Sequence, residues 1–368
     1  MDSDPNPPKS VKIRHKCSAC YKQYNKKEHL VEHMKVSFHS VHQPKCGICK
    51  KHCKSFESLR EHSKGLLAKD HCSRMFHELG CDLCMKVFCS PILLSEHKWT
   101  CQLLPPTPLG TISLSSMKSE TSSSNTCNGD VASQVREAVA LDCEMVGGGS
   151  DGTLSLCGRV CLIDESEDVI FHAYVQPQMP VTDYRSEVTG LTEEHLKDAM
   201  PLKEVQQKIQ EILYNGESIG IARIDGGKAK LLVGHSLEHD LDCLRITYPD
   251  HLIRDTAKYQ PLMKTNLVSH SLKYLTKTYL GYDIQMRTHD PYEDCVSVMR
   301  LYKRMRDQDH LKDFVGECLP SRVTEFLTKE FECSKMKDLE KLTPDELYDM
   351  SRSKYYCWCL DSLKKVRP

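Results

Sequence analysis

Two acidic residues lie two positions apart in an apolar stretch of the second half of the chain. Asp142 and Glu144 occur in LDCEMV, with AVAL just before them. On a β-strand, residues two apart point to the same face. Two carboxylates on one face of a buried strand are costly unless a cation neutralises them, and hard oxygen ligands suit Mg²⁺ or Mn²⁺. The pair predicts a divalent-cation site, with a solvated edge strand as the alternative.

A second polar group follows where the pattern changes from strand to helix. The stretch VGHSLEHDLDCL crowds several candidates together, and its members are His235, Glu238, His239, Asp240 and Asp242. Any of these side chains has the chemistry to ligate a metal ion or transfer a proton. Spacing alone does not choose among them.

A third group, THDPYEDCVSVM, combines helix-start signals with residues that these signals do not need. Pro291 fits the first helical position, Asp290 the N-cap and Glu293 the third position of a capping box. His289 and Asp294 have no role in this cap. With His289 on the loop before the helix and Asp294 in its first turn, both side chains can reach one site.

The first hundred residues carry a repeated unit of a different kind. Cys-x2-Cys recurs three times, and 10 of the 20 cysteines and 10 of the 18 histidines lie in residues 1–101. Mixed Cys and His at short spacing indicate Zn²⁺ rather than disulfides, because disulfides would not need the histidines. The first and third units have complete ligand sets, namely Cys17, Cys20, His33 and His39, and Cys81, Cys84, His97 and Cys101.

The second unit starts regularly and ends irregularly. Cys46, Cys49 and His62 have the finger spacing, but the fourth ligand is open between Cys72, which we favour, and His71. Cys53 stands where a finger normally has its core aromatic, so it is either core or ligand. A degenerate finger without zinc is the remaining alternative.

The balance of basic and acidic residues changes where the Cys-x2-Cys repeats end. Residues 1–101 hold 18 Lys and Arg against 10 Asp and Glu, whereas the rest of the chain holds 32 against 41. A basic zinc-rich region indicates binding to a polyanion such as nucleic acid. The irregular finger spacing disfavours a base-by-base DNA code and favours RNA, shape or protein binding. A purely structural or protein-docking role is the alternative.

The remaining elements must position these residues. Residues 1–16 are expected to be flexible, 17–101 to form three zinc fingers, and 102–135, which are rich in Pro, Ser and Thr, to be a disordered linker. Strands are expected at 138–146, 156–164, 169–177, 230–236 and 252–257, and helices at 193–213, 239–246, 271–281 and 292–305. Residues 309–368 are expected to be a partly helical extension.

The chain contains no apolar run long enough to span a bilayer, and its start lacks a secretory signal, so no membrane partner is expected.

The three acidic groups together resemble the motifs of the DEDDh superfamily of 3′–5′ exonucleases. LDCEMVG, GHSLEHD and His289-x4-Asp294 are similar to those of the RNA exonuclease 4 type, which includes plant small-RNA-degrading nucleases, and the fingers and KYYCWC tail resemble a plant subgroup. The resemblance spans roughly residues 137–306. It implies a ribonuclease H-like α/β fold, a five-stranded mixed sheet flanked by helices, for residues 136–308.

The resemblance also implies the roles of the site residues. Asp142, Glu144, Asp240 (rather than Asp242) and Asp294 would hold two Mg²⁺ or Mn²⁺ ions, and His289 would act as the general base. Hydrolysis would release nucleoside 5′-monophosphates from the free 3′ end of RNA, assisted by the zinc fingers. A DNA substrate and a finger-based regulator without nuclease activity are the alternatives. We expect the protein in the nucleus, with the cytoplasm as the alternative.

Overall fold

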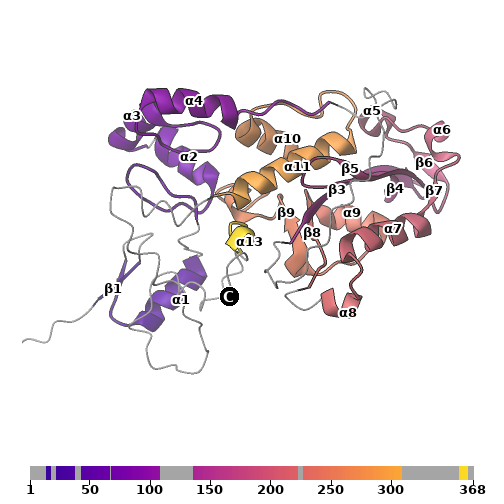
Figure 1. Cartoon of the computed structure of the whole chain (residues 1–368), viewed down its shortest axis with the longest axis horizontal. Helices are drawn as coiled ribbons and strands as arrows, with labels where there is room; N and C mark the ends of the chain where they lie inside the picture. The colour runs from indigo at the N-terminus through magenta and orange to yellow at the C-terminus, as the bar shows by residue number, and fades with distance from the viewer. Residues whose placement is uncertain are drawn as a thin grey trace, which may run out of the picture.

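The computed structural model describes residues 14–17, 22–37, 43–66, 68–107, 136–222, 227–308 and 356–363. Its larger part is a sheet with helices packed against it, and three small cysteine-containing modules lie at the other end of the molecule (Figure 1). Among the described residues, no helix is both long and apolar enough to cross a lipid bilayer.

The sheet runs in the order β7-β5-β4-β3-β8-β9, with β6 paired to the end of β3. β3 is antiparallel to β4 and parallel to β8, so the sheet is mixed. The strands are β3 (Ala138–Gly148), β4 (Leu154–Ile163), β5 (Val169–Gln176), β6 (Val181–Asp183), β7 (Met200–Pro201), β8 (Leu231–Gly234) and β9 (Ile253–Asp255). The predicted α/β class with a mixed sheet flanked by helices is confirmed. Two short strands, β6 and β7, add to the five that were expected.

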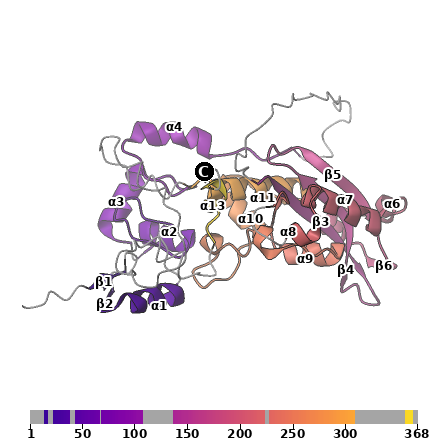
Figure 2. The same ribbon diagram turned by 60° about the horizontal axis from the view of Figure 1, so that its bottom comes forward.

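Helices pack along the sheet and carry its polar site residues. The longest, α11, lies against β3, β4 and β8, whereas α9 lies against β3 and β4, and α7 against β5 (Figure 2). The helical segments of this part are α5 (Ser186–Thr189), α6 (Glu193–Leu196), α7 (Leu202–Tyr214), α8 (Ile219–Ala222), α9 (Leu237–Leu244), η3 (Asp250–Leu252), η4 (Gln260–Leu262), α10 (Leu272–Leu275), η5 (Thr276–Leu280) and α11 (Pro291–Arg306). The helix expected over 193–213 is therefore two helices, because Pro201 lies in a short strand between them.

The N-terminal modules are ββα units or shortened forms of them. The first has β1 (His15–Lys16), β2 (Gln23–Tyr24) and α1 (Lys27–Ser37). The second and third replace the paired strands by single bridges and contain α2 (Phe56–Lys64) and α4 (Pro91–Cys101), with α3 (Asp70–Leu79) between them. Ser55 and Ser90 cap α2 and α4 by accepting hydrogen bonds from backbone N–H groups of the first turn.

The second and third modules pack against the sheet-containing part. The ring of Phe56 meets the ring of Tyr279 edge-on, with centroids 5.7 Å apart, and Arg60 donates to the carbonyl of Thr278 at 3.1 Å. The backbone N–H of Leu103 donates to the carbonyl of Leu280 at 3.0 Å. The predicted linker is thus bonded to η5 at Leu103, near its start. Its residues 108–135 lie outside the described residues.

The described end of the chain, 356–363 with α13 (Leu360–Leu363), is also buried against this part. Trp358 stacks on Tyr259 with ring centroids 3.8 Å apart. Asp361 accepts two hydrogen bonds of 2.8 Å from the guanidinium of Arg254 and one of 3.0 Å from Tyr302. A buried, bidentate ion pair of this kind holds the tail residues in one position on β9 and α11. Residues 309–355 of the predicted extension lie outside the described residues.

Candidate active site and candidate zinc sites

The structure brings the five predicted acidic and histidine residues together where β3, α9 and α11 meet. One ligand atom each from Glu144, His289 and Asp294 lies within 4.8 Å of the other two. Asp142 and Asp240 complete the group, since Asp142 lies close enough to the carboxylates of Asp240, Glu144 and Asp294 for their charges to raise its pKa. The three motifs, which together span about a hundred and fifty residues of sequence, therefore lie side by side in the structure.

Local structure explains how β3 presents its two acids. The register of β3 against β4 shifts after Glu144, where Glu144 faces Arg159 and Met145 faces Cys157. The extra residue on β4 is Gly158, and a Cβ there would lie 2.6 Å from Leu191 Cδ1. A bulge bends the strand locally and re-aims its side chains. Here it sits directly at Glu144.

Burial separates Asp240 from its neighbour Asp242. Asp240 is 4% exposed, and its Oδ1 accepts a 2.9 Å hydrogen bond from the backbone N–H of Cys143, between the two acids of β3. Asp242 is exposed on the other side of α9. Of the two, Asp240 is the one that lies beside β3 and close to Asp142.

The start of α9 is held by a residue that the sequence patterns did not single out. Asp255, at the end of β9, accepts hydrogen bonds from the backbone N–H groups of Ser236 and Leu237 at 2.8 and 3.2 Å. Ser236 has a left-handed backbone with φ of 60°, which a non-glycine residue adopts only when its surroundings hold it. Asp255 therefore positions the turn that leads into Asp240. No local spacing signals this, because the contact joins two different strand ends.

The cap of α11 matches its prediction in part. Asp290 is the N-cap, and its side chain accepts a hydrogen bond from Tyr292 N, with Pro291 in the first turn. Glu293, expected to close a capping box, is engaged elsewhere: its Oε2 accepts a 2.9 Å hydrogen bond from the backbone N–H of Gln285. His289 lies on the loop before the helix, and its backbone N–H donates to the carbonyl of Val188 at 2.7 Å.

Two further side chains contact the site and were not identified from the sequence. Gln285 Nε2 donates to Asp294 Oδ2 at 2.9 Å. Arg159 lies opposite Glu144 and reaches Asp290 Oδ1 at 3.4 Å. Both contacts depend on strand register and loop path, so no local pattern could have revealed them.

The electrostatics of the site favour a bound cation. Burial, followed by repulsion from Asp294, raises the pKa of Glu144 to about 8, against which Arg159 acts only partly. Burial is also the main cause that raises the pKa of Asp294 to about 7, and it raises the pKa of Asp142 and Asp240 well above the usual range. Ionised carboxylates packed this closely need positive charge beside them.

One oxygen atom of Asp294 also indicates a bound cation. Among the described residues, the buried oxygen Oδ1 of Asp294 has no hydrogen-bond partner. A carboxylate oxygen left without a partner inside a protein is costly, unless it ligates an ion. All four acids supply hard oxygen ligands, so the residues present fit Mg²⁺ or Mn²⁺. Burial, followed by the charge of Lys273, lowers the pKa of His289, which keeps its imidazole neutral and able to accept a proton near pH 7.

The pKa shifts predict how pH acts on stability. Between the ordinary pKa of Glu144 (4.5) and its value of about 8, the folded protein binds more protons than the unfolded chain. Stability without a divalent cation should therefore fall as pH rises from about 5 to 8, and Mg²⁺ should raise the melting temperature more at pH 8 than at pH 6. Scanning calorimetry with zinc retained in the fingers measures both trends. In Glu144→Gln the pH dependence of the Mg²⁺ effect should be smaller; an undiminished dependence would contradict this explanation.

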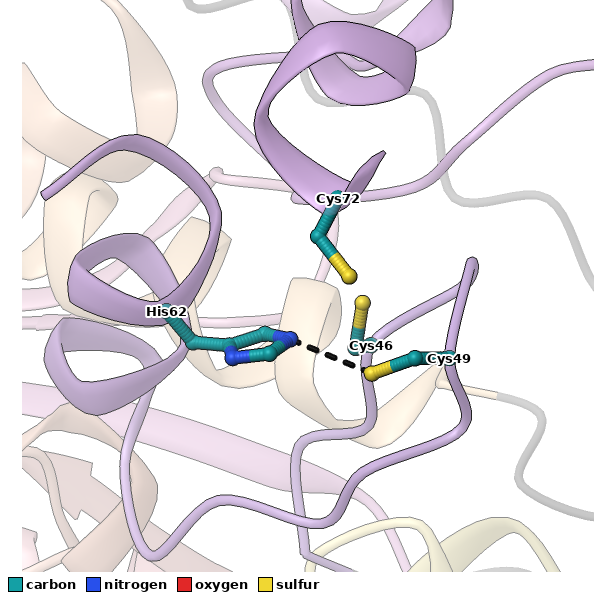
Figure 3. Close-up of side chains that lie close together, drawn as sticks. All are labelled: Cys46, Cys49, His62 and Cys72. Carbon is teal, nitrogen blue, oxygen red and sulfur yellow. Dashed lines mark hydrogen bonds between the residues drawn. The ribbon is translucent and has the colours of Figure 1, made fainter. Parts of the chain in front are cut away.

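The second finger-like module brings together four of the predicted zinc ligands. Side chains of Cys46, Cys49, His62 and Cys72 point toward one another, with Cys49 Sγ 3.2 Å from His62 Nε2 (Figure 3). Cys72 comes from α3, which explains the long irregular spacing. His71 is exposed and does not belong to this group.

The other modules differ in how much of them is described. In the third, Cys81, Cys84, His97 and Cys101 form one group, and the sulfurs of Cys81 and Cys101 are 3.7 Å apart. Tetrahedral Zn²⁺ with Zn–S bonds of about 2.3 Å requires sulfurs about 3.8 Å apart, so the spacing fits. In the first, Cys17 is buried and the ring of His33 lies beside that of Tyr24, whereas Cys20 and His39 lie outside the described residues. Cys53, left open as core or ligand, is buried outside the group of the second module.

Comparison with known proteins agrees with the location of the candidate active site. Residues 139–302 match the model of the RNase_T family, described as Exonuclease. RNA exonuclease 4 of Candida glabrata is 35% identical over 188 residues, which cover 50% of this chain and 66% of that protein. RNA exonuclease 4 of Homo sapiens is 37% identical over 173 residues, which cover 46% of this chain and 37% of that protein. The chain thus spans less than two thirds of these relatives.

A solved structure of the Neurospora crassa Pan2 catalytic unit (protease and nuclease domain) is 21% identical, with a TM-score of 0.39 over 46% of this chain and 26% of that chain. A likeness this weak says nothing about substrate. The two curated relatives and the family model are the stronger findings, and all five residues of the candidate active site fall within residues 139–302. Residues 139–302 are thus similar to exonucleases, and about half of the chain is similar to RNA exonuclease 4.

Proposed function

We propose that the protein is a 3′–5′ exoribonuclease that hydrolyses phosphodiester bonds with the help of two divalent cations and releases nucleoside 5′-monophosphates. The observation that carries the proposal is the meeting of Glu144, His289 and Asp294 at one point, beside a buried Asp294 oxygen that has no partner among the described residues. The match of residues 139–302 to an exonuclease family and the similarity of about half of the chain to RNA exonuclease 4 support RNA as the substrate. DNA as the preferred substrate is the alternative.

The proposed chemistry assigns a role to each side chain. Asp142, Glu144, Asp240 and Asp294 would hold two cations, and such ions would supply the positive charge that activates a water and stabilises a leaving oxygen. His289, neutral because its pKa is lowered, accepts the proton of the attacking water. Gln285 keeps Asp294 oriented through its 2.9 Å hydrogen bond, and Asp255 keeps the turn before Asp240 in place.

The test uses the full-length protein on matched oligonucleotides. Single- and double-stranded RNA and DNA of one sequence, labelled at the 5′ end, are incubated with Mg²⁺, with Mn²⁺ or with neither. A ladder that shortens from the 3′ end, with mononucleotides as products and RNA degraded faster than DNA, is the expected result. Faster degradation of DNA would replace the substrate assignment. The absence of any cation-dependent hydrolysis would favour the regulator without nuclease activity.

Replacing His289 by Asn tests the proposed base. The expected result is a single-turnover rate constant lower by roughly 10²–10⁴-fold, since a positioned base contributes that much, with the Mg²⁺ dependence little changed. Single-turnover hydrolysis of labelled RNA across pH measures it. His239→Asn is the matched control, because His239 is exposed on α9. Equal activity of the two variants would show that His289 is not the base.

We propose that the second and third modules are zinc-stabilised parts of the nuclease rather than separate binding units. Contacts between these modules and the sheet-containing part support this proposal. Glu57 Oε2 of the second module accepts hydrogen bonds from the backbone N–H and hydroxyl of Thr265 at 2.5 and 2.8 Å. Arg304 also donates to the carbonyl of Cys101 at 2.5 Å. Both contacts join residues about two hundred positions apart.

Nucleic-acid binding by the basic residues 1–101 and a nuclear location remain predictions. Binding of RNA at increasing salt separates the two roles of this region, because phosphate contacts by Lys and Arg steepen the salt dependence. Point substitution of its exposed lysines is preferable to deletion, which would uncover Tyr279 and Thr265 on the nuclease.

A further inference from the structure

Three buried cysteines form a cluster that the proposed nuclease chemistry does not use. The Sγ atoms of Cys143, Cys157 and Cys243 all lie within 4.8 Å of one another. The three residues come from β3, β4 and α9, and are 9%, 4% and 9% exposed. Thus three separate elements each direct one thiol to the same point.

The chemistry of this group differs from that of the carboxylate site. Cys143 lies between Asp142 and Glu144, and on a strand its side chain projects to the opposite face. Thiolates are soft ligands that select Zn²⁺, Cd²⁺ or Cu⁺, whereas carboxylates select Mg²⁺ or Mn²⁺. The two sites on the two faces of β3 therefore have opposite metal preferences.

Access and spacing are both suited to an ion. A pocket of about 50 Å³ borders the cluster, and Cys157, Cys243, Asp242 and Arg245 are among its lining residues. Thiolates around one Zn²⁺ lie about 3.8 Å apart. Small side-chain rotations that move each sulfur atom by about 1 Å or less would therefore bring the three sulfurs to the spacing of a Zn²⁺ site. Three protein ligands leave a fourth position open, and the pocket offers space for a water or small thiol there.

We propose that Cys143, Cys157 and Cys243 bind one thiophilic metal ion, separate from the finger sites and from the carboxylate site. Two hydrogen bonds connect the cluster to Asp240, one through its carboxylate and one through its main-chain carbonyl. The backbone N–H of Cys143 donates to Asp240 Oδ1 at 2.9 Å, and Cys243 Sγ donates to the carbonyl of Asp240 at 3.2 Å. An ion at the three sulfurs would thus lie directly behind a residue of the candidate active site.

The test counts metal in the full-length protein loaded with Zn²⁺ and dialysed against excess Mg²⁺. Mass spectrometry of the metal should find one Zn²⁺ fewer per chain in Cys157→Ser and in Cys243→Ser than in the unchanged protein. Cys89→Ser, an exposed cysteine outside all of the clusters, should lose none. Loading with Cd²⁺ should show the same difference in the ultraviolet thiolate absorption.

Folding is checked separately, because buried cysteines also serve simply as small apolar side chains. Circular dichroism and the melting temperature identify which of the two serine variants is folded, and Cys157→Ala removes the thiol without adding a hydroxyl. Folded variants that keep the full Zn²⁺ count would overturn the proposal. Displacement of the extra ion by millimolar Mg²⁺ would also overturn it, since a hard cation does not compete for three thiolates.

Discussion

Asp142→Ala should abolish hydrolysis and leave the protein folded. The substitution removes a carboxylate that the other three acids surround, and with it a ligand of the proposed cations. Loss of a residue that only orients a metal ligand already costs about 10–100-fold, so loss of a ligand itself should exceed that range. Single-turnover cleavage of 5′-labelled RNA at saturating Mg²⁺ measures the effect.

Asp142→Ala should also remove repulsion. The pKa of Asp142 is raised by burial and then by Asp294, Asp240 and Glu144, so the alanine variant should be at least as stable as the unchanged protein without divalent cation. The pair Asp240→Ala and Asp242→Ala supplies the matched control, since the first residue is buried in the site and the second exposed. Near-normal Mg²⁺-dependent activity in Asp142→Ala would contradict the assignment of the site.

Cys72→Ser should remove one Zn²⁺ per chain and destabilise the sheet-containing part of the protein. A finger of this size has too small a core to fold without its ion. Loss of the ion would release α2 from the sheet-containing part, and the contact between Phe56 and Tyr279 would be lost with it. Removing a buried Phe side chain costs about 3–5 kcal/mol, and we expect a loss of comparable size in the free energy of unfolding.

The matched control for Cys72→Ser is His71→Ser, which changes the exposed neighbour on α3. Zinc content and chemical denaturation of both variants, followed by their RNA cleavage rates, distinguish the roles. Retention of zinc by Cys72→Ser and its loss from His71→Ser would reverse the assignment of the fourth ligand. A normal melting temperature after zinc loss would show that the second module does not stabilise the sheet-containing part.

The local sequence determined the strand alternation and the helix ends because these features depend only on residues close in the sequence. The alternation of β3 places Asp142 and Glu144 on one face, and Asp290 with Pro291 starts α11 as the cap signals predict. Gly281 closes the preceding helix with φ of +91°, a conformation that side chains disfavour. A side chain at Gly281 would also approach Gln102 and Leu83 closely. The same glycine therefore leaves room for the third module to pack at this point.

Only the tertiary structure decided which distant residues meet. Arg159 faces Glu144 because of strand register, and Asp240 bonds to Cys143, 97 positions away. Cys72 joins the second module through an additional helix, and the modules pack on the sheet-containing part through pairs about two hundred residues apart. Spacing in the sequence reports contacts within one helix or strand, whereas these contacts depend on how separate elements pack. The chemistry of the carboxylates could therefore be inferred from the chain, and their partners and the position of the fingers could not.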